Sequence, residues 1–190
     1  TISDFKSYID SLLPELMYLN LYFQGEPFLN KDLPEMIRYA SDNGVFTCVS
    51  TNAIALTEDM VRRLSESGIG RLIICLDGAN EKSYSTYRVG GDFNRVVQAI
   101  KFSVKYKLPL EVQCLLLSTT EKEIDEIKSL CKELGVNRLV FKKAQFYDDF
   151  LMRFSCKNTI YDLANGGGKS VLMLLLLQTV IPNCTLDDKQ

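Results

Sequence analysis

The chain contains no histidine among its 190 residues. This absence excludes Ser-His and Cys-His nucleophile pairs, acid–base catalysis by imidazole, and most zinc sites. Six cysteines are present, but no two are spaced closely enough to form a CxxC or CxxxCxxC ligand set. We therefore interpret the cysteines as reduced thiols, because a free cysteine usually packs as a small apolar side chain.

Long apolar runs and clusters of like charge are also missing. The longest apolar run, Val171 to Leu177, is far shorter than the roughly 20 residues of a membrane span. The N-terminus, from Thr1 to Phe5, has neither the basic start nor the apolar core of a signal peptide. The net charge is -2 and basic residues are interspersed with acidic ones, so no basic face for nucleic acid is expected. These absences predict a cytoplasmic protein with no membrane and no nucleic-acid partner.

Short, continuously apolar runs alternate with longer amphipathic segments along most of the chain. Such runs are typical of strands buried on both faces, and the amphipathic segments are typical of helices. The predicted strands are Tyr18–Phe23, Phe46–Val49, Arg71–Leu76, Leu110–Leu117 and Arg138–Phe141. The predicted helices are Ser3–Leu13, Leu33–Asp42, Glu58–Ser67, Phe93–Tyr106 and Glu121–Leu134. The alternation predicts an α/β fold with right-handed βαβ units and a parallel sheet, either an open Rossmann-like sheet or a barrel.

Polar residues follow every predicted strand, at the strand ends where parallel α/β proteins place their active sites. These residues are Gln24-Gly25-Glu26-Pro27, Ser50-Thr51-Asn52, Asp77-Gly78, Ser118-Thr119-Thr120, and the group Lys142, Lys143 and Gln145. We call this set the carboxyl-end rim, and its composition suits a polar, zwitterionic ligand. Helix caps and turns explain each Ser, Thr or Asp equally well when it is taken singly. Glu26 is the more specific feature, because a carboxylate between Gly25 and Pro27 lies in a turn that a ligand ammonium group can approach.

Four motifs, in order along the chain, resemble the radical S-adenosylmethionine (SAM) superfamily. The segment Leu21–Leu29 resembles the GEP motif after the second barrel strand, and Ser50-Thr51-Asn52 resembles the Ser/Thr-Asn end of the third. Leu76-Asp77-Gly78-Ala79 resembles the SLDG turn, with Cys75 in place of the serine. The stretch Tyr84–Phe93 resembles the YxxYR.GG.F stretch of the SPASM and anaerobic sulfatase-maturase-like branch.

The resemblance implies a partial parallel (β/α) barrel of the TIM type, with SAM bound at the carboxyl-end rim. It implies that Gly25, Glu26 and Pro27 bind the amino group of the methionyl moiety. It also implies that Ser50 and Asn52 line the ribose and methionine side.

The same resemblance implies roles for two further residues. Arg88 would pair with the SAM carboxylate through its bidentate fork, and Asp77 would close the rim. In this superfamily, electron transfer from a [4Fe-4S] cluster cleaves SAM to a 5'-deoxyadenosyl radical, which abstracts hydrogen from a peptide, protein or small-molecule substrate.

The sequence departs from the superfamily pattern in its cysteines. The cluster is held by a CxxxCxxC loop after the first barrel strand, and that segment would precede Thr1. The scattered cysteines offer no substitute, because cluster ligands must converge on one site. We therefore predict no metal ligands and expect residues 1–146 to be a truncated radical SAM domain, inactive as given. The edge left by a missing strand would favour self-association.

Residues 147–190 form a second predicted unit, outside this resemblance. Within it, Asn165–Ser170 and the apolar helix Val171–Val180 resemble the phosphate loop of chromosome-maintenance-type and ABC-type ATPases. In such loops backbone amides cradle phosphates, lysine reaches them, and serine holds magnesium. The nucleotide-binding residues implied by this resemblance are Asn165, Gly166, Gly168, Lys169 and Ser170. We favour a fusion of unrelated gene fragments over a working nucleotide site or a helix that docks on the barrel. Left uncovered, the apolar helix would favour self-association.

Three functional hypotheses follow from the sequence. The first is a radical SAM enzyme fragment whose partners are SAM and a peptide, protein or small-molecule substrate. The second is a non-catalytic SAM-binding or scaffold module, which differs from the first by the lack of an upstream CxxxCxxC loop in the full gene. The third is a P-loop NTPase fragment, which would require an acidic Walker-B strand downstream of Gln190.

Overall fold

The computed structural model describes residues 1–23 and 25–143. In this part of the chain five parallel strands form one sheet, in the sequential order β1-β2-β3-β4-β5. The strands are β1 (Tyr18–Asn20), β2 (Phe46–Thr51), β3 (Arg71–Cys75), β4 (Leu110–Leu116) and β5 (Leu139–Lys143). The helices are α1 (Ile2–Leu12), α2 (Leu33–Asp42), α3 (Glu58–Ser65), α4 (Glu81–Tyr87), α5 (Phe93–Lys105) and α6 (Ile124–Glu133), with a 3-10 turn η1 (Pro27–Leu29). The predicted α/β class and partial TIM-like barrel are confirmed.

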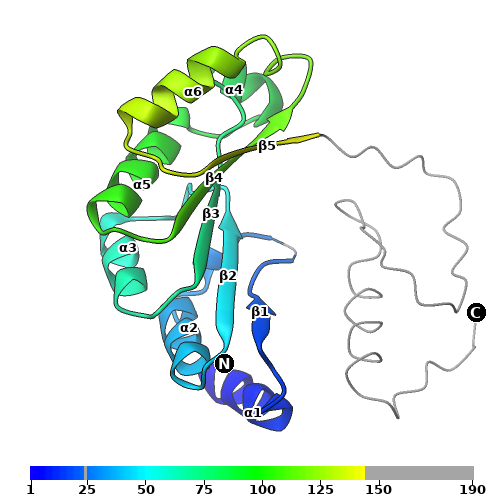
Figure 1. Ribbon diagram of the computed structural model, residues 1–190, viewed down its shortest axis with the longest axis vertical. Coiled ribbons are helices and arrows are strands. Elements are labelled where there is room, and N and C mark those ends of the chain that lie inside the picture. Colours follow the sequence, from blue (N-terminus) through cyan, green and yellow to red (C-terminus); the bar gives the residue numbers. More distant parts are fainter. Residues whose placement is uncertain (24, 144–190) are drawn as a thin grey trace, which may run out of the picture. The chain divides into compact units, whose positions relative to one another are not determined.

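The hydrophobic core lies between the sheet and the helices on one of its faces. Figure 1 shows α2, α3, α5 and α6 along that face of the sheet. The core residues that are 0% exposed include Val49, Leu72, Ile74 and Val112 from the strands and Ile37, Leu64, Ile100 and Ile127 from the helices. Each helix contributes one apolar stripe, and each strand contributes alternate residues, because successive strand side chains point to opposite faces.

The alternate strand residues lie on the opposite side of the sheet, which we call the inner face. The strand register places Ser50 beside Ile73, Ile73 beside Glu111, and Leu115 beside Lys142 on this face. The prediction of strands that are apolar on both sides is therefore correct only for the helix-covered face. The inner face instead mixes apolar, thiol and charged side chains.

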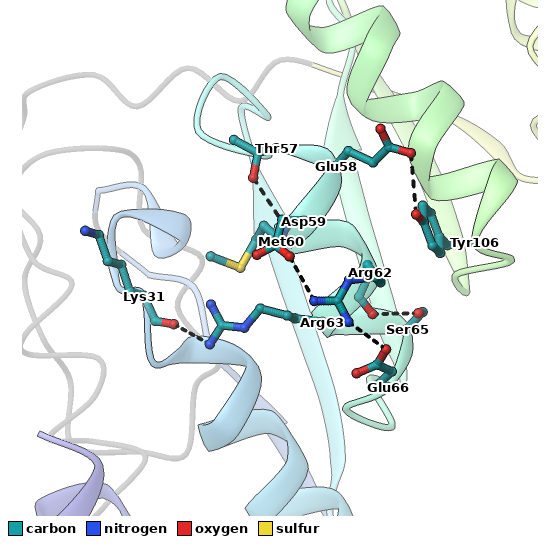
Figure 2. Close-up of polar contacts among 10 residues, drawn as sticks. All are labelled: Lys31, Thr57, Glu58, Asp59, Met60, Arg62, Arg63, Ser65, Glu66 and Tyr106. Atoms are coloured by element: carbon teal, nitrogen blue, oxygen red, sulfur yellow. Dashed lines mark hydrogen bonds and ion pairs between the residues drawn. The ribbon is translucent and has the colours of Figure 1, made fainter.

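Polar contacts connect neighbouring helices outside the core. Figure 2 shows α3 starting after the cap Thr57, and shows Arg63 of this helix donating to the Lys31 carbonyl oxygen at 3.0 Å. Tyr106, at the end of α5, donates its hydroxyl hydrogen to Glu58 of α3 at 3.4 Å. Contacts of this kind near the surface add little stability. Within the described residues, no helix has the length and apolar character needed to cross a membrane.

Among the element boundaries that differ from the sequence prediction, the end of β1 and the start of α6 are shifted furthest. Strand β1 ends at Asn20 rather than Phe23, because after the Leu21 amide bonds to the Cys48 carbonyl at 2.9 Å the chain turns away toward η1. Helix α6 begins at Ile124 rather than Glu121. The hydroxyl of Thr120, which is fully buried, bonds the backbone at the end of β4 and holds this segment in a turn.

Replacement of Leu72 by alanine tests the core. Leu72 lies in the central strand β3 and is 0% exposed. We expect Leu72→Ala to lower the free energy of unfolding by about 2–5 kcal/mol, because the lost burial leaves a cavity. Urea denaturation measures the change, and Leu29→Ala, at a side chain 75% exposed, is the matched control. Similar midpoints for the two variants would contradict the described core.

The reactivity of two core cysteines provides a second test. Burial, and next the negative charge of Asp77, raises the pKa of the Cys114 thiol to about 12, and burial raises that of Cys131 to about 11. Only the thiolate reacts with iodoacetamide, so both residues should resist alkylation at about pH 8 until the chain unfolds and their pKa values fall to about 8.5. Timed alkylation with peptide mass spectrometry measures this, and fast modification of either cysteine in the folded protein would refute it.

Candidate functional site

Glu26 connects the loop after β1 to the end of β2. One carboxylate oxygen accepts hydrogen bonds from the Thr51 hydroxyl at 2.5 Å and the Phe28 amide at 3.2 Å. The other oxygen accepts a hydrogen bond from the Asn52 amide at 3.0 Å. The carboxylate is therefore fixed in place, and it stays half-buried at the carboxyl-end rim. A carboxylate oxygen has two lone pairs, so a fixed carboxylate can still accept from a ligand ammonium group.

The neighbouring glycine leaves room beside this carboxylate. Gly25 has a φ of 75°, a left-handed conformation that favours glycine, and a Cβ placed on it would meet nothing within 4 Å. Pro27 begins η1 directly after Glu26, so the turn is short and rigid. The segment Gly25–Pro27 thus combines a fixed carboxylate with open space, as the predicted ligand contact requires.

The three consecutive residues at the end of β2 make different contacts. The Ser50 hydroxyl lies 3.9 Å from the Cys75 sulfur, on the inner face. Asn52 uses its side-chain oxygen within a turn, where it accepts from the Ile54 amide at 2.9 Å. Thr51, which was not among the predicted binding residues, makes the bond to Glu26 and is 3% exposed. The sequence run Ser50-Thr51-Asn52 marks Thr51 as a polar residue at the strand end. Its hydrogen bond to Glu26 depends on tertiary structure.

Asp77 and Arg88 form a buried ion pair at the same edge of the sheet. One Asp77 oxygen accepts from Arg88 Nε at 2.7 Å and lies 2.6 Å from Nη2. The other oxygen accepts from the Leu115 amide of β4 at 2.8 Å. Asp77 is 1% exposed, whereas the Arg88 side chain is 31% exposed. Arg88 can therefore face a ligand, while the structure uses both Asp77 oxygens internally, and direct contact between Asp77 and a ligand stays a prediction.

The charge state of Arg88 follows from this pairing. Burial lowers the pKa of the guanidinium, but the charge and hydrogen bonds of Asp77 more than offset burial, so the pKa is raised overall. The guanidinium is thus a permanent cation whose orientation is set by a buried carboxylate. This is the arrangement that suits recognition of a ligand carboxylate.

Helix α4, which the sequence pattern did not predict, holds Arg88 at its C-terminal end. The helix lacks apolar periodicity and starts with a capping box between Asn80 and Ser83. Its buried residue Tyr84 packs against two glycines: a Cβ at Gly78 would lie 2.4 Å from the Tyr84 backbone nitrogen, and one at Gly91 would lie 2.8 Å from the Tyr84 ring. The stretch that resembled a binding motif therefore contains mainly residues that position Arg88.

Inner-face residues close to the rim add a thiol and a second cation. Burial, and then the negative charge of Asp77, raises the pKa of the Cys75 thiol, whereas Arg88 and Lys142 act in the opposite direction. Register places Lys142 beside Leu115, in the row next to Cys75. Glu123, also absent from the prediction, accepts from the Ala79 amide at 3.1 Å and supports the turn after β3.

These residues can be compared with the groups that a bound cofactor would require. A fixed carboxylate at Glu26 and an oriented guanidinium at Arg88 match the ammonium and carboxylate groups of SAM. The four described cysteines are free thiols, and the described residues contain no cluster of three metal-ligating side chains. The described part of the chain therefore does not fit an iron–sulfur cluster. The predicted phosphate-loop residues and the unit 147–190 lie outside the described residues.

Comparison with protein families matches residues 15–131 to the model of the radical SAM superfamily. This match covers more than half of the chain. The chain belongs to the radical SAM superfamily. The matched range contains every predicted SAM-binding residue, from Gly25 to Arg88.

Curated relatives are moderately similar to this chain in sequence. AdoMet-dependent heme synthase of Methanosarcina barkeri is 29% identical over 136 residues, which are 71% of this chain and 39% of that protein. PqqA peptide cyclase of Bradyrhizobium diazoefficiens is 29% identical over 141 residues, 72% of this chain and 37% of that protein. Probable GTP 3',8-cyclase of Methanocaldococcus jannaschii is 31% identical over 112 residues, 58% of this chain and 38% of that protein. The radical SAM chain thus spans about two fifths of their length.

Solved structures show the same fold at lower identity. Native anSMEcpe with bound AdoMet and a Cp18Cys peptide matches 75% of this chain and 41% of that chain, with a TM-score of 0.61 at 19% identity. Streptococcus suis SuiB matches 95% of this chain and 40% of that chain, with a TM-score of 0.65 at 15% identity. At these identities the likeness concerns the partial barrel fold and nothing finer.

The Asp77–Arg88 pair is tested by Asp77→Asn, which keeps the shape of the side chain and removes its charge. We expect the free energy of unfolding to fall by about 2–3 kcal/mol. Breaking a fully buried ion pair costs about 3–5 kcal/mol, and the cost should be smaller here because Arg88 is partly exposed. Chemical denaturation measures this loss. The control is Asp59→Asn, whose exposed pair with Arg62 should contribute little. Equal stability of the two variants would show that the buried pair is not a structural link.

Proposed function

We propose that the carboxyl-end rim binds SAM, as the SAM-binding part of an enzyme that acts on a peptide or protein substrate. The observation that carries this proposal is the presence of two fixed, opposite charges at one sheet edge, Glu26 and Arg88. Glu26 would accept the SAM ammonium group, and Arg88 would bind the SAM carboxylate with the part of its guanidinium that Asp77 leaves exposed. Gly25 and Pro27 would shape the opening beside the carboxylate.

The remaining predicted residues have supporting roles in this proposal. Ser50 and Asn52 would line the ribose and methionine side, and Asp77 would orient Arg88 from below the rim. When bound in a superfamily member, a [4Fe-4S] cluster supplies the electron that cleaves SAM. The described residues offer no ligand set for it, so we propose SAM binding, and not SAM cleavage, for this part of the chain.

The substrate class rests on the relatives. PqqA peptide cyclase is named for a peptide, and structures of anSMEcpe and SuiB contain a bound peptide. Other relatives are named for heme synthesis and GTP cyclisation, so a small-molecule substrate is the second candidate. A non-catalytic SAM-binding module is the alternative, which the lack of a cluster ligand set among the described residues favours. An NTPase role would rest on residues 165–170, which are outside the described part.

Calorimetric titration of SAM into the purified chain tests the proposal. We expect saturable binding by the native sequence and weakening by roughly tenfold or more in Arg88→Ala, because a charge-assisted bidentate contact is lost. Arg88→Lys keeps the charge near Asp77 but removes the fork, so it should fold well and still bind more weakly. Glu26→Gln should weaken binding in the same assay by removing the charge that holds the ammonium group.

The matched control for the titration is Arg95→Ala, since Arg95 lies on α5 with a side chain 66% exposed. Circular dichroism establishes that each variant is folded before its affinity is compared. A well-folded native chain that binds no SAM would refute the proposed site. Equal affinity in the Arg88 and Arg95 variants would refute the role of Arg88 while leaving SAM binding intact.

A further inference from the structure

A cavity of about 530 Å³ opens at the amino ends of the strands, at the opposite strand ends from the carboxyl-end rim. The loops that lead into β3, β4 and β5 surround it. Its walls include apolar side chains such as Val104 and Leu108, and its charged residues are Arg71, Lys107, Glu111 and Arg138. The volume is within the range of about 300–1,000 Å³ typical of small-molecule sites, and apolar walls with a few polar groups are their usual composition.

Arg71 is held in this amino-end cavity on an aromatic platform. Its guanidinium lies 6.0 Å from the centroid of the Phe46 ring. The ring itself stacks on Tyr18 at 5.3 Å and 17°, and it fits against Gly70, where a Cβ would come within 2.6 Å of the ring. Among the described residues, half-buried Arg71 has no hydrogen bond or ion pair to its guanidinium, so the charge is positioned without an acceptor.

The acid of the cavity does not neutralise Arg71. Glu111 is 3% exposed, and one of its oxygens accepts from Gln113 at 2.5 Å. Its other oxygen forms an ion pair with Arg138 Nε at 2.5 Å, although the two groups are not aligned as a hydrogen bond. Lys107, at the exposed edge of the cavity, also has no ion pair within the described part of the chain. Within the part of the chain that the structure describes, Arg71 and Lys107 thus remain without an ion-pair partner.

We infer that the amino-end cavity binds a small molecule bearing an oxyanion, a carboxylate or a phosphate, through Arg71 with support from Lys107. A partly buried cation without an acidic partner is unfavourable, and a planar guanidinium held on an aromatic ring presents two parallel donors to such an oxyanion. The apolar walls then contact the body of the ligand. This site is separate from the SAM site, because it lies at the other ends of the same strands.

Amide-resolved NMR titration of the full chain with benzoate, and separately with inorganic phosphate, tests the inference. We expect at least one probe to cause saturable shifts at the amides of Gly70, Arg71 and Lys107. Saturation by benzoate alone indicates a carboxylate ligand with an apolar body, and saturation by phosphate alone indicates a phosphate ligand. Arg71→Ala should weaken the binding by roughly tenfold or more, and Arg71→Lys, which keeps the charge, by less.

Arg38→Ala is the matched control, because Arg38 is an exposed arginine on α2 outside the cavity. Its affinity should stay within about twofold of the native chain, since an exposed charge contributes little. Affinities should also be unchanged when SAM is saturating, which separates this site from the proposed SAM site. Lack of saturation by both probes, shifts located elsewhere, or equal weakening by Arg38→Ala would overturn the inference.

Discussion

The parallel register of the five strands is the constraint on which the other features depend. Parallel strands all have their carboxyl ends on one side of the sheet and their amino ends on the opposite side. Because the helices cover only one face in the described part, the inner face and the two edges carry the polar residues. The carboxyl-end rim and the amino-end cavity are therefore consequences of the same strand direction, one at each end of the sheet.

Side chains at the rim link structural elements, and the proposed function also assigns them to ligand recognition. Glu26 joins η1 to β2, and Asp77 joins β3, β4 and the end of α4. Each of these hydrogen bonds restricts the motion of a charged side chain. In the proposed function that side chain either contacts SAM or orients a residue that does. A preorganised charge binds its ligand better, since less ordering remains to be done on binding. The same arrangement makes these residues costly to remove, because their loss leaves partners buried without a hydrogen bond.

The two candidate sites differ in how their cations are balanced. Arg88 is already paired with Asp77, and its exposed part is available to a carboxylate on a ligand that carries positive charge of its own. Arg71 rests on an aromatic ring without an acidic partner among the described residues, so a ligand must supply the whole counter-charge. A zwitterion at the rim and a simple oxyanion at the cavity fit these two situations.

The sequence by itself determined the strand–helix alternation, the parallel class and the polar segments after each strand, because burial periodicity and turn residues are local properties. It also located the helix Leu33–Asp42 at its observed bounds. Only the tertiary structure decided that Thr51 bonds Glu26, that Asp77 bonds Arg88, and that α4 forms on a tyrosine packed between glycines. Those contacts join segments separated along the chain or lack an apolar period, and packing of the folded chain decides which partners meet.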